Sequence, residues 1–213
     1  TERQLTVSLK DKEVMLAEVH HRVKNNLQQI CSILNLQEHS FESSHDRDLL
    51  QNCIMRIRTM DLMQEKVYSS DKLSEIFFPG YIQELVSDIL YFYQISRDRI
   101  VIDFQIENIP IDINLALPCG QILNELITNS MKHAFPNGDK GNITINFQQR
   151  QNNYTLLFSD NGVGFPENFL FPGEDTLGLV IVENLVKQLN GTIEIKDECG
   201  LTYTIVFPAK HKF

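Results

Sequence analysis

Two adjacent histidines lie inside a long predicted helix, in the segment EVHHRVKNNL at residues 18–27. At about 100° per residue, the apolar stripe of this helix centres between Val19 and Val23. His20 then lies about 55° from that centre, at the edge of the stripe, whereas His21 lies about 155° away and faces solvent. The spacing therefore predicts that His21 is the imidazole available for chemistry.

Glu18 and Asn25 lie one helical turn before and after His21, on the same predicted face. A neutral imidazole is a competent nucleophile near pH 7, and a carboxylate near its second ring nitrogen stabilises the imidazolium that forms on attack. An exposed histidine on a polar face is usually inert, and adjacent helical residues point in different directions, which disfavours a metal site on the pair. The neighbouring carboxylate and amide make His21, Glu18 and Asn25 candidate catalytic residues.

A second polar group lies on a helix predicted at residues 115–134, in the stretch NELITNSMKHA. Glu125, Asn129 and Lys132 are spaced at i, i+4 and i+7 and share one face of that helix. A carboxylate and an amide oxygen one turn apart suit a hard cation whose remaining ligands are phosphate oxygens. An ordinary solvated helix face is the alternative for this segment taken alone.

Two glycine turns follow this helix in the chain. Asp160 ends a predicted strand and opens the sequence DNGVGF, in which Gly162 and Gly164 let the backbone pass close to a ligand. An aspartate at a strand end can accept a hydrogen bond from an exocyclic amine such as that of adenine. Asn-Gly turns are common in proteins, so this turn alone is weak evidence.

The second glycine turn, TLGL at residues 176–179, opens a helix predicted at residues 179–190. The free N–H groups and partial positive charge of a helix N-terminus favour phosphate, so even an acidic chain can hold ATP there. Residues 165–175, between the two turns, contain three phenylalanines together with proline and glycine. They are predicted to form a mobile lid, with an ordinary surface loop as the alternative.

The elements that position these residues differ between the two ends of the chain. The first proline is Pro79 and the first glycine is Gly80, so the preceding residues are predicted to form long helices. Apolar residues at spacings of three and four predict one helix at residues 10–39 and a second that begins at residues 43–46. The two helices are expected to pack as an antiparallel hairpin.

We expect two domains, at residues 1–72 and 73–213, with a hinge near residues 69–78. The second part alternates helical and strand patterns, which predicts an α/β sandwich of helices packed on a mixed sheet of about five strands. The chain as a whole is assigned to the α+β class. The predicted helices lie at 80–93, 115–134 and 179–190, and the predicted strands at 100–105, 142–149, 154–160, 192–196 and 202–207.

The 213 residues are 42% apolar and 22% charged, an ordinary globular balance. Nineteen basic and 28 acidic residues give a net charge of −9, which disfavours nucleic-acid binding because that depends on Lys and Arg at phosphates. The sequence contains no run of about 18 apolar residues, so it predicts no membrane-spanning helix. The four separated cysteines are expected to be reduced and mostly buried in a cytoplasmic protein. Because the chain begins at Thr1 without a signal-peptide pattern, we expect it to be a piece of a longer protein.

Together these motifs resemble those of a known family of kinases. EVHHRVKNNL is similar to the phosphoacceptor segment of the sensor histidine kinases that have an HRxKN core. NELITNSMKHA, DNGVGF and TLGL resemble the N box and the two glycine boxes of the ATP-binding fold shared by histidine kinases, DNA gyrase, mismatch-repair ATPases and the large heat-shock chaperone. The resemblance covers essentially the whole chain.

The resemblance implies a role for each matched residue. His21 would take the γ-phosphoryl group of ATP, Asn129 would bind Mg²⁺, and Glu125 would help to position the ion or a water. Asp160 would recognise the adenine amino group. The residues implied to shape the nucleotide site and its lid, or to face the phosphates, are Gly162, Gly164, Gly178, Leu179, Lys132 and His133.

The chain departs from the commoner histidine kinases at three places, one of which is the second glycine turn, with one glycine instead of the two or three often seen. In those kinases the residue after the phosphoacceptor is acidic and serves as a base, whereas here it is Arg22. Glu18 is our substitute candidate, because it shares the predicted face of His21. Related chains often carry Thr directly after the glycine before the last strand, whereas Leu201 takes that place here, so any hydroxyl contact must come from Thr202 or be absent.

The resemblance also implies partners. A phosphohistidine would pass its phosphoryl group to an aspartate of a response-regulator receiver domain, and an upstream sensor domain would regulate the first helix. The apolar stripe favours a homodimeric four-helix bundle, with folding of the hairpin onto its own second domain as the alternative. Two other functions stay open: a Ser/Thr kinase with the same ATP-binding fold, and a degenerate kinase that acts as a docking scaffold.

Overall fold

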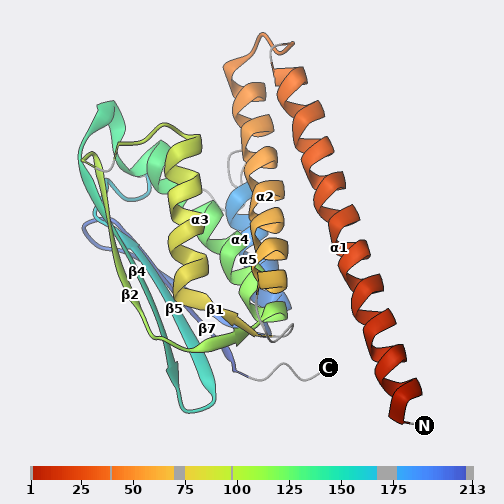
Figure 1. The fold of residues 1–213 in the computed structure, drawn as a ribbon. Coiled ribbons are helices and arrows are strands. Elements are labelled where there is room, and N and C mark those ends of the chain that lie inside the picture. The colour runs from red at the N-terminus through yellow and green to blue at the C-terminus, as the bar shows by residue number, and fades with distance from the viewer. Residues whose placement is uncertain (1, 39, 70–74, 97, 167–176, 210–213) are drawn as a thin grey trace. The chain divides into compact units, whose positions relative to one another are not determined.

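The computed structural model describes residues 2–38, 40–69, 75–96, 98–166 and 177–209 (Figure 1). The chain divides into two compact units, Thr1–Leu73 and Ser74–Phe213, which are described separately. The hinge and the lid expected from the sequence fall largely outside the described residues.

The first unit is a hairpin of two antiparallel helices, α1 (Glu2–Glu38) and α2 (Ser44–Ser69) (Figure 1). The predicted hairpin is confirmed, but α1 begins well before residue 10, because the preceding residues contain no glycine or proline that would stop a helix. At the start of α2, the Asp46 N–H donates to Ser43 Oγ at 3.4 Å, which satisfies one free amide of the first turn.

Polar contacts join α1 to α2. Gln51 Nε2 donates to Glu38 Oε1 at 2.7 Å, and Lys24 Nζ lies 3.4 Å from Glu65 Oε2. Several apolar side chains of the hairpin nevertheless stay exposed, so part of the stripe predicted on α1 is uncovered. They are Met15, Val19, Ile30, Ile33, Leu36 and Leu49. None of the described helices combines the length and apolarity that a membrane span requires.

The second unit has two layers, in which α3 (Phe78–Phe92), α4 (Ile113–Asn129) and α5 (Leu177–Gln188) cover one face of a five-stranded sheet (Figure 1). The strand order is β2-β4-β5-β7-β6, with β2 and β4 parallel and all other neighbours antiparallel. This confirms the predicted α/β sandwich and its mixed sheet. The strands are β2 (Ile100–Ile106), β4 (Gly141–Arg150), β5 (Asn153–Asp160), β6 (Thr192–Asp197) and β7 (Leu201–Pro208).

The core of the second unit lies between the sheet and its helices. Alternate residues of a strand point to opposite faces, and every second residue of β5 is buried. The buried row ends at Asp160, whose carboxylate therefore projects from the same face as the apolar residues before it. Those residues are Tyr154, Leu156 and Phe158.

A two-stranded ladder was not predicted from the sequence. It pairs β1 (Glu75–Phe77) with β3 (Pro110–Asp112), and strands of three residues are too short to show an alternating pattern. Asp112 Oδ1 accepts a hydrogen bond from the Asn114 N–H at 2.7 Å. This cap explains why α4 begins at Ile113, slightly earlier than predicted.

The sequence predicts that Gly191 ends α5 in the usual C-terminal glycine position, and the structure differs from that prediction in one detail. Asn190, not Gly191, has the left-handed backbone conformation, with φ of 53°. The Gly191 N–H donates to Val186 O at 2.9 Å. A Cβ on Gly191 would lie 2.7 Å from Val206 O, so this position needs glycine for space.

The cysteines are less buried than expected. All four are free, but only Cys119 is buried, Cys31 is half-buried, and Cys53 and Cys199 are exposed. The expectation was wrong because Cys53 lies on an exposed face of α2 and Cys199 in the turn between β6 and β7. Burial raises the pKa of the Cys119 thiol above its ordinary range.

We expect the thiols to fall into separate classes of reactivity toward a thiolate-directed reagent near pH 8. Cys53 and Cys199 should react quickly, while Cys119 should react only after denaturation, because it is buried and its raised pKa keeps the thiol protonated. Counting modified thiols over time by mass spectrometry measures this. Cys199→Ser should remove one fast site, and rapid native labelling of Cys119 would contradict its burial.

Candidate functional site

The polar end of α4 continues into a different type of helix. α4 ends at Asn129, and Ser130–Ala134 form a π-helix instead of the α-helical turn predicted up to residue 134. Short π-helical segments are rare in proteins, but those that do occur often lie at functional sites. Because a π-turn contains more residues than an α-turn, the residues after Asn129 are rotated away from the α-helical register that the sequence pattern assumed.

Lys132 and His133 lie in this π-helical turn. The Lys132 ammonium lies 5.7 Å from the centre of the Tyr93 ring, at the C-terminal end of α3, which is a cation–π distance. Lys132 is half-buried and His133 is exposed. The contact of both residues with phosphate, implied by the resemblance, stays a prediction.

Glu125 and Asn129 lie against the start of α5. A Cβ on Gly178 would lie 3.1 Å from Glu125 Oε2 and 3.5 Å from both Nδ2 and Oδ1 of Asn129. The structure therefore brings the N box and the second glycine turn together, which the sequence predicted only through its resemblance to a known ATP-binding fold. Glycine at position 178 therefore lets the start of α5 approach the carboxylate of Glu125, which is buried, and the amide of Asn129 closely. The next residue, Leu179, is buried.

The donor set around Glu125 and Asn129 fits a magnesium ion that is shared with a ligand. A carboxylate and an amide oxygen are the hard ligands that this ion prefers. Among the described residues, no group of three or more His, Cys, Asp and Glu side chains is placed to hold a metal by itself. A cation at Glu125 and Asn129 would need further oxygens from phosphate or water.

Asp160 is held by three hydrogen bonds and is only 4% exposed. Its Oδ1 accepts from the N–H groups of Gly162 at 3.0 Å and Leu201 at 3.3 Å, and its Oδ2 accepts from Ser130 Oγ at 2.6 Å. A carboxylate offers about four acceptor positions, so about one is left for a ligand N–H. Burial raises the pKa of the nearby Tyr203 phenol, and the Asp160 and Asp197 carboxylates raise it further, so this ring stays neutral.

The first glycine turn packs against the end of the π-helix. The Val163 N–H donates to Ala134 O at 3.0 Å, and a Cβ on Gly162 would collide with Ala134. Gly164 has φ of 74°, a left-handed conformation that favours glycine. The turn is therefore seated between the N-box segment and the strands that follow it.

Sequence reasoning missed Ser130, which donates the shortest of the three bonds to Asp160. A serine beside Asn129 looks like any helical residue, and only the tertiary contact shows its role. Thr202, the alternative source of a hydroxyl, pairs instead with Ser159 Oγ at 2.8 Å. Because strand residues alternate, Ser159 and Thr202 lie on the face of the sheet opposite to Asp160.

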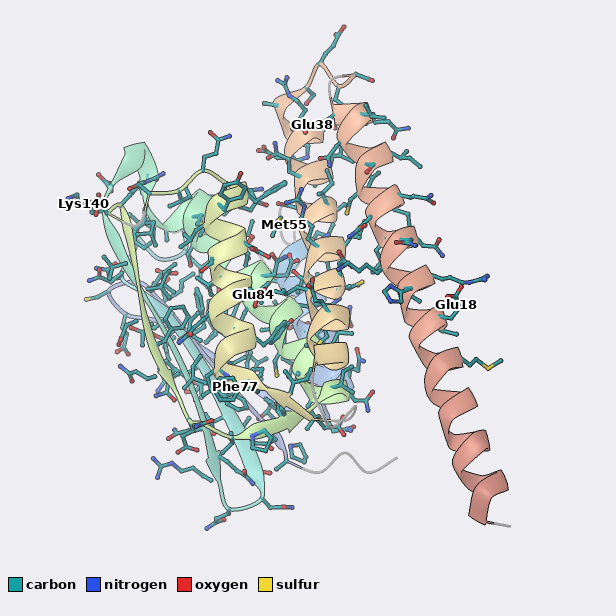
Figure 2. All side chains as sticks on the ribbon, viewed as in Figure 1. Glu18, Glu38, Met55, Phe77, Glu84 and Lys140 are labelled. Carbon is teal, nitrogen blue, oxygen red and sulfur yellow. The ribbon has the colours of Figure 1, made fainter. Side chains whose placement is uncertain are left out.

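The candidate phosphoacceptor lies in the first unit. His21, Glu18 and Asn25 are all exposed on α1, as predicted for His21 from the helical wheel. Figure 2 shows Glu18 on this helix. Arg22 Nε donates to Glu18 Oε1 at 2.8 Å, so the carboxylate proposed as a base is part of an exposed ion pair. The side chain of His20, expected at the edge of the stripe, lies outside the described part of the structure.

A cavity of about 310 Å³ lies between α5 and β6. It adjoins the first glycine turn at Phe165 and the second at Leu179, but it is not lined by Glu125, Asn129 or Asp160. The lining is mostly apolar. It consists of Phe165, Leu179, Val182, Glu183, Ile193, Ile195 and Asp197.

The two-layer fold and these contacts define an ATPase domain. Residues 114–211 match the family described as histidine kinase-, DNA gyrase B- and HSP90-like ATPase. Residues 18–93 match the family described as histidine kinase. Both parts of the chain therefore match families of histidine kinases, and the resemblance found in its sequence is confirmed.

Relatives of known name agree with this assignment. The chain is 28% identical over 196 residues to the sensor histidine kinase PdtaS of Mycobacterium tuberculosis, covering 89% of this chain and 38% of that protein. It is 26% identical over 196 residues to blue-light-activated histidine kinase 2 of Erythrobacter litoralis, covering 90% and 55% of the two chains. The chain thus spans well under two thirds of the length of both relatives.

Solved structures share the fold. The histidine kinase domain of the Erythrobacter litoralis EL346 blue-light-activated kinase superposes with a TM-score of 0.68 at 25% identity, covering 91% of this chain and 90% of that one. The catalytic domain of the histidine kinase ThkA gives a TM-score of 0.52 at 21% identity over 64% of this chain, and that likeness concerns the fold alone.

Proposed function

We propose that this chain transfers the γ-phosphoryl group of ATP to its own His21 and then to an aspartate of a response-regulator receiver domain. Residues 1–72 would serve as the phosphoacceptor and dimerisation domain, and residues 73–213 as the ATP-binding domain. The observation that carries the proposal is the Asp160 carboxylate, which is buried, oriented by three donors and left with about one acceptor position for an exocyclic amine.

The remaining residues of the second unit suit the phosphate end of a nucleotide. Glu125 and Asn129 would hold Mg²⁺, and the absence of a side chain at Gly178 avoids crowding their oxygens. Leu179 lies in the first turn of α5, where backbone N–H groups favour phosphate. Lys132 and His133 would add positive charge. When bound, MgATP supplies the phosphoryl group, and catalysis by the protein consists mainly of positioning and charge neutralisation.

At His21, a ring nitrogen would form the N–P bond while the bond from the γ-phosphorus to the bridging oxygen breaks and ADP leaves. The proton lost from the imidazolium needs a base, and the carboxylate of Glu18 is our candidate because it lies on the same exposed part of α1. Its ion pair with Arg22 would have to loosen for that role. An unchanged labelling rate in Glu18→Gln would remove Glu18 as the base.

Incubation with γ-labelled ATP and Mg²⁺ tests the function. A label that is stable in base and lost in acid indicates phosphohistidine, and its transfer to added receiver domain would support the second step. The reverse stability would indicate a Ser/Thr kinase. Failure to bind nucleotide would favour a docking scaffold instead.

We further propose that the hairpin pairs with a second copy of the chain. The exposed apolar side chains of α1, including Ile30, Ile33 and Leu36, support an interface that the hairpin alone does not cover. Light scattering of the purified chain checks the mass, and a monomer at micromolar concentration would contradict the proposal. A cytoplasmic location is proposed because ATP-dependent phosphotransfer and four unpaired thiols suit that compartment. We also propose that an upstream sensor domain regulates the kinase.

Ser130→Ala is expected to weaken ATP binding by roughly tenfold. The change removes a buried hydrogen bond to a carboxylate, worth about 1.5–3 kcal/mol, and leaves Asp160 less well oriented toward its ligand. Titration with a fluorescent ATP analogue measures the affinity, and Ser159→Ala on the opposite face of the sheet is the matched control. Equal affinities of Ser130→Ala and the unaltered chain would contradict the role of Ser130.

A further inference from the structure

The hairpin formed by β6 and β7 touches the first glycine turn at both ends. At the first end, the Leu201 N–H donates to Asp160 Oδ1 at 3.3 Å. At the second end, the Phe165 N–H donates to Asp197 Oδ2 at 3.0 Å. The same hairpin therefore contacts Asp160 at the start of the turn and Phe165 at its end.

Asp197 also lies against the glycine that precedes Phe165. A Cβ on Gly164 would collide with the Asp197 carboxylate, and the φ of 74° at Gly164 is itself in the left-handed region. The Asp197 carboxylate thus restricts the conformation of the turn, through close contact with Gly164 and a hydrogen bond from Phe165. No residue other than glycine fits at position 164 without displacing either the turn or Asp197.

The hairpin is well placed to act as a fixed support. Asp197 is the last residue of β6 and pairs with Leu201 across the turn. The Glu198 N–H donates to Gly200 O at 3.1 Å, and a Cβ on Gly200 would collide with Asp160 O. The position of the Asp197 carboxylate is therefore tied to the strand that carries Asp160.

We propose that Asp197 is a positioning residue of the nucleotide site, which orders the second half of the glycine turn through its contacts with Gly164 and Phe165. This inference rests on the proposed ATP-binding function. A turn with two glycines loses much conformational freedom when it is ordered, and a binding site that is ordered in advance avoids that cost when the ligand arrives. The Asp197 carboxylate does not need to touch the nucleotide to have this effect.

The test compares two substitutions at one position. Asp197→Ala removes the acceptor of the Phe165 N–H, whereas Asp197→Asn keeps an acceptor oxygen of the same shape. We expect Asp197→Ala to raise both the Kd and the KM for ATP about tenfold while the maximal labelling rate changes less than about threefold. Asp197→Asn should restore affinity to within about threefold of the unaltered chain.

Glu194→Ala is the matched control, because Glu194 lies on the same strand and pairs with Lys196 at 3.4 Å instead of with the turn. It should bind ATP like the unaltered chain. Unchanged affinity in Asp197→Ala, or equal loss in Asp197→Asn and Asp197→Ala, would overturn the proposal.

Amide hydrogen exchange separates this proposal from the proposed function. Without any nucleotide, Asp197→Ala should speed exchange at residues 163–165 relative to the unaltered chain, with no change in the β4 and β5 core amides. If the unaltered chain binds no ATP but the turn still loosens, the proposed function fails and the positioning role stands. Unchanged exchange at the turn would overturn the positioning role whatever the nucleotide does.

Discussion

His21→Gln is expected to reduce acid-labile labelling of the chain by at least about a hundredfold. Glutamine lacks the ring nitrogen that forms the N–P bond, and no other described residue combines an imidazole with neighbours like Glu18 and Asn25 on one exposed helix face. ATP binding should be unaffected, because no residue of the proposed nucleotide site lies in the same unit. Labelling with γ-labelled ATP at saturating nucleotide, followed by gel separation, measures the loss.

His20→Gln is the matched control, since it removes an imidazole from the adjacent position and should keep most of the labelling. The assignment to His21 fails if His20→Gln loses the label and His21→Gln retains it. Peptide mapping under basic conditions would then locate the modified residue directly.

Asp160→Asn is expected to weaken ATP binding by about a hundredfold. The amide keeps one acceptor oxygen for the N–H groups of Gly162 and Leu201, but its NH₂ group replaces the oxygen that faces Ser130. A donor would then meet the exocyclic amine of adenine, which is also a donor. Loss of one charge-assisted bond and this mismatch together amount to about 3 kcal/mol.

Calorimetric titration with a non-hydrolysable ATP analogue measures the effect. Asp103→Asn is a suitable control, because it removes the same charge from an exposed strand residue that bonds Gln105 at 2.6 Å. The thermal midpoint of Asp160→Asn should be compared with that of Asp103→Asn, to show that both remain folded. Affinity within threefold of the unaltered chain would exclude Asp160 as the recognition residue.

Local patterns in the sequence predicted most of the fold. Spacings of three and four marked the helices, and alternation marked all five strands of the mixed sheet, because these periods follow directly from backbone geometry. The wheel also placed His21 on the exposed face of α1. In the same way, the strand ending at Asp160 could be recognised, since its buried row is visible in the sequence itself.

Other features depended on contacts between distant segments. Neither the bond from Ser130 to Asp160 nor that from Phe165 to Asp197 has a signature in either segment alone. The π-helical turn after Asn129 replaces the α-helical turn that the local sequence predicts. The ladder of β1 with β3 has strands too short to show a local pattern. The sequence therefore determined which elements form and which residues carry the chemistry. Only tertiary packing decided how the carboxylates are oriented, because the free energy of those contacts exists only once the layers have come together.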